Sequence, residues 1–247
     1  MEDILAVKNL TLKFGALAAV DDLTFSVRKG EIFGIAGPNG AGKTTLFNAI
    51  TGVYRSTGDI LFYGKQINGL KPHVICQKGI ARTFQASIIF SSMTVESNIR
   101  AGATFGHKRA SKEKVKETTE KIMELLSIQE KSDVVVHGAR LFDKKLVMLG
   151  AALATEPKLL FLDEPLGGLS PQEILQSVEI FKKINKEMKI TLVVIEHIMK
   201  FLMLLSDRLM ILSNGKSVIL DIPEKVAKNK KVVEIYLGEE YAVDAKD

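Results

Sequence analysis

Residues 37–45 read Gly37-Pro38-Asn39-Gly40-Ala41-Gly42-Lys43-Thr44-Thr45 and match the pattern G-x-x-x-x-G-K-[ST] at every fixed position. The glycines let backbone N–H groups turn inward around phosphate groups. Lys43 places a positive charge at the outer two phosphates, and the Thr44 hydroxyl is a magnesium ligand. A strand-like apolar run, residues 32–36, precedes the stretch, and a helical pattern follows it. The segment therefore predicts a binding loop for a nucleoside triphosphate rather than a glycine-rich turn without a ligand.

Two acidic residues follow a second apolar run further along the chain. Residues 159–162 are uninterrupted apolar sequence, and Asp163 and Glu164 come directly after them. Buried parallel strands read as continuous apolar runs, and ligands gather at their carboxyl ends. Asp163 is therefore a candidate magnesium ligand, and Glu164 a candidate to orient or deprotonate the attacking water. The alternative is an acidic turn after a core strand, and the phosphate loop makes it the weaker of the two.

Two further polar residues follow predicted strands. Gln85 comes after residues 80–84, and His197 comes after residues 192–196. Side chains at the ends of these strands are candidates to reach the outer phosphate. Spacing alone favours simpler roles, a surface amide and a helix-capping imidazole, and does not choose between the alternatives.

Length and composition favour one large α/β domain with subdomains. The chain has 247 residues, 46% apolar and 26% charged, which is enough for a substantial core. The densest apolar stretch, residues 201–205, is far shorter than the roughly twenty residues that cross a membrane. The start, Met1-Glu2-Asp3, lacks a basic signal region, and a lone Cys76 excludes an internal disulfide. We therefore expect the protein to reside in the cytosol, which is a reducing compartment.

The positive charge of the chain carries little functional information. The formal net charge is +5 and the isoelectric point is near 9.1. The lysines of residues 112–121 and 182–189 alternate with glutamates, and aromatic residues are not interleaved with them. We interpret these segments as solvated helix faces, and we expect no nucleic-acid partner.

The order of predicted elements divides the chain into segments. Residues 4–30 contain strand-like runs, whereas residues 94–155 show mostly helical periodicity, which indicates a helical insertion. Strand and helix alternate again after it, and a helix is predicted to begin at Pro171, because Ser170 and Glu173 form a capping box. Residues 223–247 read as a lysine-rich amphipathic segment and a polar tail.

These motifs, in this order, resemble the nucleotide-binding subunits of ATP-binding-cassette (ABC) transporters over essentially the whole chain. The resemblance implies that Phe14 stacks on adenine with Val20 beside the base, and that residues 37–45 are the Walker A loop. It also implies that Gln85 ligates magnesium and senses a membrane partner. In the same way it assigns Asp163 to Walker B, Glu164 as the catalytic glutamate, residues 167–170 to the D-loop and His197 as the switch histidine.

The resemblance also implies a fold and its cofactors. We expect an α/β P-loop NTPase (RecA-like) core with an N-terminal antiparallel β subdomain and an inserted α-helical subdomain. Residues 1–93 and 156–222 are predicted to form the β subdomain and core, residues 94–155 the helical subdomain, and residues 223–247 a C-terminal helical segment and tail. The implied cofactors are ATP and Mg²⁺.

Three phrases resemble the cassettes of branched-chain amino-acid importers, namely residues 79–85, 195–197 and 233–239. Urea or amide importers and lipopolysaccharide-export cassettes look similar and stay open as alternatives. The resemblance implies partners: integral membrane permease subunits, whose coupling helix docks at residues 86–93, and a substrate-binding protein. It places the chain at the cytoplasmic face of the cell membrane.

One segment departs from the family pattern. The signature of the type Leu-Ser-Gly-Gly-Gln falls at residues 139–143, which read Ala139-Arg140-Leu141-Phe142-Asp143. In the family this segment offers a serine hydroxyl and glycine N–H groups to ATP held by the opposite subunit. A unit charge such as that of Asp143 opposes phosphate binding by about 3 kcal/mol at about 5 to 6 Å and an effective dielectric near 20. A helix kept merely for packing is favoured over a rewired phosphate contact.

The damaged signature predicts a heterodimer with a second, different ABC ATPase subunit, because the intact phosphate loop needs a proper signature from its partner. A soluble cassette ATPase acting on nucleic acid or ribosomes and a non-hydrolysing regulatory cassette are weaker alternatives. A GTPase is disfavoured because Asn185-Lys186 is followed by Glu187-Met188 instead of the guanine-reading Asn-Lys-x-Asp.

Overall fold

The computed structural model describes residues 2–106 and 110–236. The chain forms two compact units. The first unit comprises Met1–Lys71 and Thr191–Asp247, and the second comprises Pro72–Ile190. The predicted tail, residues 237–247, lies outside the described residues, as does part of the phrase at residues 233–239.

The first unit contains the antiparallel sheet predicted near the N-terminus. Its strands are β1 (Asp3–Phe14), β2 (Leu17–Arg28), β4 (Thr57–Phe62) and β5 (Lys65–Gln66), in the spatial order β2-β1-β4-β5. The β1–β2 hairpin begins its turn at Gly15, which has a φ of +59°. Apolar side chains of these strands are buried, among them Leu5, Val7 and Leu10.

The first unit also contains a mostly parallel set of strands. In this set β3 (Ile32–Ala36) pairs in parallel with both β8 (Thr191–Ile195) and β9 (Arg208–Ser213), and β10 (Lys216–Asp221) pairs antiparallel with β9. Every residue of β3 and β8 is buried, as the continuous apolar runs predicted. The helices of this unit are α1 (Lys43–Ile50), α7 (Met199–Leu205) and α8 (Pro223–Ala227).

A buried ion pair fixes the strand that leads into the phosphate loop. The Arg208 guanidinium donates to both carboxylate oxygens of Glu31, over 2.9 and 2.7 Å, and to the Ser26 carbonyl over 2.8 Å. The bond to Glu31 raises the pKa of Arg208. Glu31 directly precedes β3, so the pair ties the start of β3 to the start of β9.

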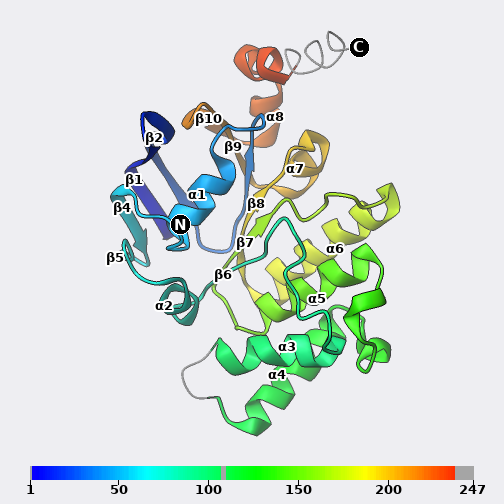
Figure 1. The fold of residues 1–247 in the computed structure, drawn as a ribbon. Coiled ribbons are helices and arrows are strands. Elements are labelled where there is room, and N and C mark those ends of the chain that lie inside the picture. Colours follow the sequence, from blue (N-terminus) through cyan, green and yellow to red (C-terminus); the bar gives the residue numbers. More distant parts are fainter. Residues whose placement is uncertain (1, 107–109, 237–247) are drawn as a thin grey trace. The chain divides into compact units, whose positions relative to one another are not determined.

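The second unit combines helices with one parallel strand pair. Its helices are α2 (Pro72–Gln77), α3 (Val95–Phe105), α4 (Lys112–Leu125), α5 (Leu141–Leu153) and α6 (Pro171–Met188), with short 3₁₀ turns at Gln129–Lys131 and Val136–Gly138. Helix α3 packs against α4 and α5 (Figure 1). Strands β6 (Ile80–Arg82) and β7 (Leu159–Asp163) pair in register, with Arg82 opposite Phe161.

Element boundaries agree with most of the sequence expectations. The capping box at Ser170 and Glu173 is present, and α6 begins at Pro171. The strand expected over residues 80–84 is shorter, because β6 ends at Arg82 and only the Thr83 N–H still bonds to the Phe161 carbonyl, over 2.8 Å. The strand expected over residues 191–195 is β8, with the same bounds. The boundaries of the helical insertion, 94–155, lie inside the second unit and stay a prediction.

Within the described residues, we find no helix that combines the length and the hydropathy needed to cross a membrane.

Candidate active site

The phosphate loop follows β3 directly, in the first unit. Gly37 has a φ of +152°, and a Cβ atom there would lie 2.0 Å from the Leu212 carbonyl oxygen. Gly42 has a φ of +100°, and a Cβ atom there would lie 2.2 Å from the Ala19 carbonyl oxygen. Both positions therefore exclude any side chain. The loop ends at Gly42, where α1 begins and leaves its first N–H groups available to an anion.

The Lys43 ammonium is held across the loop. Lys43 is 5% exposed, and its Nζ donates to the Gly37 carbonyl over 2.6 Å and to the Pro38 carbonyl over 2.9 Å. The neighbouring Asn39, Gly40 and Thr44 are exposed. The loop thus presents backbone N–H groups, one fixed positive charge and an exposed hydroxyl, which suits an anionic ligand.

Phe14 is the last residue of β1, in the same unit as the loop. The residue is 47% exposed, and its ring stands edge to face with Tyr54, with ring centroids 5.3 Å apart at 84°. Val20 is fully buried, so its side chain belongs to the core of the unit, and its predicted place beside a base stays a prediction. Tyr54 was missed at the sequence level, because nothing in its spacing from Phe14 marks the contact.

The two acids at the end of β7 lie in the second unit, and each is held by a residue at or after β6. Asp163 is 1% exposed, and its Oδ2 accepts a 2.6 Å bond from Arg82. The other oxygen, Oδ1, is buried without a hydrogen-bond partner among the described residues. The Gln85 amide nitrogen donates to Glu164 Oε2 over 2.6 Å. The structure therefore brings together Gln85 and Glu164, two of the predicted site residues.

Glu164 has a φ of +44°, an uncommon conformation for a residue with a side chain. Such positions cost on the order of 1–3 kcal/mol and cluster at functional sites. The turn that follows β7 thus carries local strain at the residue expected to handle the proton.

His197 follows β8 in the first unit. Its side chain is 56% exposed, and its backbone N–H donates to Oε2 of Glu196 over 3.2 Å. The same carboxylate oxygen lies 3.7 Å from the His197 Nδ1 atom, and Glu196 is fully buried. The imidazole is accordingly open to a ligand on one side and next to a buried carboxylate on the other.

The segment expected to be the signature forms the start of α5. Arg140 is the N-cap residue but makes no side-chain capping bond. The negative charge of Asp143 is paired, because its carboxylate accepts a 2.6 Å bond from Lys131 and a 3.4 Å bond from Arg140. Phe142 is 8% exposed, and its ring lines a small apolar cavity with Leu146 and Phe181.

A family model for the ABC transporter matches residues 20–167 of the chain. The chain belongs to the ABC transporter family. The cassette is 33% identical over 251 residues to the high-affinity branched-chain amino acid transport ATP-binding protein BraF of Pseudomonas aeruginosa, covering 96% of this chain and 98% of that protein. It is 34% identical over 255 residues to the probable branched-chain amino acid transport ATP-binding protein LivG of Methanocaldococcus jannaschii, covering 96% and 98%.

A solved structure confirms the fold of the cassette. An ATP-binding cassette of an ABC transporter, in its ADP conformation, matches with a TM-score of 0.87 and 31% identity, over 96% of this chain and 100% of the other. The predicted α/β P-loop fold, with its β subdomain and helical insert, is thereby confirmed. The cassette is an ATPase of the ABC family.

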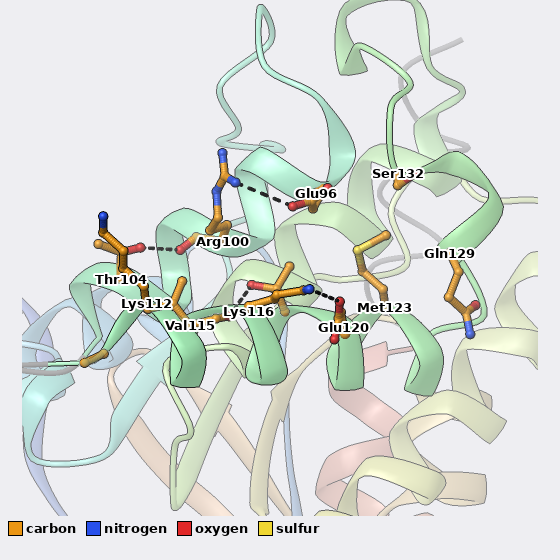
Figure 2. A pocket seen from close by; sticks show the side chains of 12 residues that line it. Glu96, Arg100, Thr104, Lys112, Val115, Lys116, Glu120, Met123, Gln129 and Ser132 are labelled. Carbon is orange, nitrogen blue, oxygen red and sulfur yellow. Dashed lines mark hydrogen bonds and ion pairs between the residues drawn. The ribbon is translucent and has the colours of Figure 1, made fainter.

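A hollow of about 710 Å³ opens between α3 and α4 in the second unit (Figure 2). Arg100 pairs with Glu96 and Lys116 with Glu120 along it, at 3.6 and 3.8 Å. No predicted nucleotide-site residue lines this hollow, and its exposed ion pairs are typical of a solvated helix surface.

Replacing Phe142 with alanine is expected to lower the free energy of unfolding of the cassette by about 3 to 5 kcal/mol, because a buried ring would leave a cavity beside Leu146 and Phe181. Urea unfolding followed by circular dichroism measures the change. The matched control is Leu141→Ala on the same turn, where the side chain is 43% exposed and the expected change is within about 0.5 kcal/mol. Equal losses from both variants would contradict a packing role specific to Phe142.

Proposed function

We propose that this cassette hydrolyses ATP to drive import of branched-chain or other amino acids through separate transmembrane subunits. The observation that carries the proposal is the phosphate loop, with Lys43 fixed across it by two carbonyls. It occurs in a chain that matches branched-chain amino acid transport proteins over nearly their whole length. Those relatives favour this function over lipopolysaccharide export and over a soluble, non-transport ATPase.

Nucleotide binding uses Phe14, at the end of β1, and the phosphate loop at residues 37–45. Phe14 stacks on the adenine, and the N–H groups of residues 37–45 surround the phosphates. Lys43 exchanges its carbonyl partners for oxygens of the outer phosphates. The free-energy cost of losing the two carbonyl contacts is small, because the ammonium gains charged phosphate oxygens as partners in their place.

The residues present fit a magnesium ion. The Asp163 Oδ1 atom is buried and has no hydrogen-bond partner among the described residues, which suits a hard cation or its bound water. The Thr44 hydroxyl and the Gln85 amide oxygen are the other oxygen donors proposed, and the Gln85 nitrogen already bonds to Glu164. Mg²⁺, when bound with ATP, neutralises charge on the β- and γ-phosphate oxygens.

Hydrolysis needs a base and a group at the γ-phosphate. Glu164 accepts a proton from the attacking water as the water oxygen bonds to the γ-phosphorus and the bond to the β–γ bridging oxygen breaks. His197 donates a hydrogen bond to the γ-phosphate. The Gln85 amide keeps the Glu164 carboxylate in place while the products, ADP and phosphate, form.

The proposed partners are integral membrane permease subunits, a substrate-binding protein and a second, different cassette, at the cytoplasmic face of the membrane. The relatives' names as transport ATP-binding proteins support this assignment. Ile88, Phe90 and Met93 are 63%, 58% and 42% exposed within residues 86–93, the segment predicted to dock a permease helix. Exposed apolar side chains grouped in this way favour a protein partner.

The state of residues 139–143 supports the proposal of a second, different cassette. The Phe142 side chain is packed inside the unit and the Asp143 side chain is bonded to Lys131 and Arg140, so neither side chain offers a contact to a neighbour's phosphate. The phosphate loop of this cassette therefore requires an intact signature from a different subunit. The site that pairs with residues 139–143 is the degenerate one.

Purification of the tagged cassette from membranes tests the proposal. We expect it to carry permease subunits and a second cassette with an intact signature, and we expect the complex to turn over ATP at least about tenfold faster than this chain alone, because a preorganised phosphate contact is worth about that factor or more. Mass spectrometry identifies the subunits, and phosphate release gives the rates. Full turnover by a homodimer of this chain would contradict the heterodimer.

A further inference from the structure

Tyr54 stands against the ring that the proposed function assigns to adenine. Phe14 lies at the end of β1 beside the open turn at Gly15, and the residue is about half exposed. A side chain in this position has few core neighbours to restrict its rotamer. The edge-to-face pair with Tyr54, at 5.3 Å and 84°, is the aromatic contact found for Phe14 among the described residues.

The backbone of Tyr54 is fixed to the helix that begins in the phosphate loop. The N–H groups of Val53 and Tyr54 both donate to the Asn48 carbonyl, over 2.8 and 3.1 Å. Asn48 belongs to α1, which starts at Lys43. Tyr54 is therefore placed relative to the phosphate loop by a short, hydrogen-bonded segment of the same unit.

We propose that Tyr54 is a positioning residue, which holds the Phe14 ring at a fixed place relative to the phosphate loop so that the base stacks on it without first ordering the ring. The inference rests on the proposed function, since it takes Phe14 as the adenine platform. An edge-to-face pair restricts the orientation of both rings. A binding group that is already ordered raises affinity, because the ligand does not have to order it on binding.

Tyr54 contributes through its ring and not through its hydroxyl. The Tyr54 ring makes the pair with Phe14, whereas its hydroxyl makes no hydrogen bond within residues 2–106 and 110–236. Tyr54→Phe is therefore expected to keep the positioning of the Phe14 ring, and Tyr54→Ala is expected to remove it. The effect acts on the base, so it is absent for inorganic tripolyphosphate, which carries the phosphate chain without adenine.

The experiment measures the dissociation constants of a non-hydrolysable ATP analogue and of inorganic tripolyphosphate for Tyr54→Ala, Tyr54→Phe and a matched control. For Tyr54→Ala we expect the dissociation constant of the analogue to rise about three- to tenfold, which is the range expected for the loss of one aromatic pair. The dissociation constant of tripolyphosphate should stay unchanged. The KM for ATP rises in the same ratio with kcat constant. Tyr54→Phe binds like the parent chain.

Tyr63→Ala is the matched control, because Tyr63 is also a half-exposed tyrosine of the first unit in an angled pair, with Phe62 at 4.8 Å. It is expected to leave both constants unchanged. Equal weakening of the analogue and of tripolyphosphate by Tyr54→Ala would overturn the inference, since Tyr54 would then act through α1. An unchanged analogue constant would overturn it as well.

A fourth variant separates this inference from the proposed function. Phe14→Ala should weaken the analogue by more than Tyr54→Ala does, because it removes the platform itself. If Phe14→Ala has no effect, the assignment of the adenine site fails. If Phe14→Ala weakens the analogue and Tyr54→Ala does not, the adenine site stands and only the role of Tyr54 is lost.

Discussion

Replacing Glu164 with glutamine is expected to lower ATP turnover by about 10²- to 10⁴-fold, the usual contribution of a positioned general base, while ATP affinity stays nearly unchanged. Glutamine has the shape of glutamate but cannot take a proton from water. Because the change removes an interaction made only during reaction, kcat falls and KM does not rise.

The structure gives a specific reason why binding survives this substitution. The Gln85 amide nitrogen donates to Glu164 Oε2 over 2.6 Å, and a glutamine at position 164 keeps a carbonyl oxygen to accept that bond. The strained turn at φ +44° also remains, since the two side chains have the same backbone preferences. The position of the segment after β7 is therefore preserved, and only the proton acceptor is lost.

Glu156→Gln is the matched control for Glu164→Gln. Glu156 also adopts a positive φ, 49°, and forms an exposed 3.0 Å pair with Lys114 on the helical surface. Removing that charge should change the free energy of unfolding by less than about 1 kcal/mol and should leave ATP turnover unchanged. Phosphate release under saturating ATP measures turnover, and equilibrium binding measures affinity. Loss of ATP binding in Glu164→Gln would contradict the role of Glu164 as the base.

Local sequence predicted those parts of the fold and site that depend on neighbouring residues. The phosphate loop, the apolar runs of β3 and β8 and the capping box at Ser170 each lie within a few residues and appear in the structure. Their physical causes are local: a pattern of glycines, burial on both faces of a strand, and a helix start. The roles of the site residues stay predictions that the variants above address.

The side chains that hold the site residues were not predictable from sequence. Arg82 meets Asp163 because β6 and β7 pair in parallel, although the two residues are 81 positions apart. The Lys131 ammonium donates to the Asp143 carboxylate because the helical region packs the two residues together. This bond offsets the negative charge at the start of α5. Spacing carries no signal for such contacts, since tertiary packing alone creates them.

Replacing Gly37 with alanine is expected to weaken ATP binding by at least about 100-fold, the effect of misplacing a binding group by about 1 Å. The same change should lower the free energy of unfolding by about 2 to 6 kcal/mol, from about 1–3 for the unfavourable backbone conformation and about 1–3 for overpacking. Calorimetric binding of ATP and urea unfolding measure the two effects.

The size of the Gly37 effect follows from what surrounds the residue. The added Cβ would lie 2.0 Å from the Leu212 carbonyl oxygen, which belongs to β9 and cannot move without disturbing the pairing of Ala36 with Ile211. The loop must therefore shift instead, and the backbone N–H groups that face the phosphates shift with it.

Gly30→Ala separates this clash from backbone strain, because Gly30 has a φ of +83° but nothing within 4 Å of the added Cβ. That control should cost about 1–2 kcal/mol and leave ATP affinity unchanged, and an equal loss of affinity in both variants would show that strain, not the contact with β9, sets the loop.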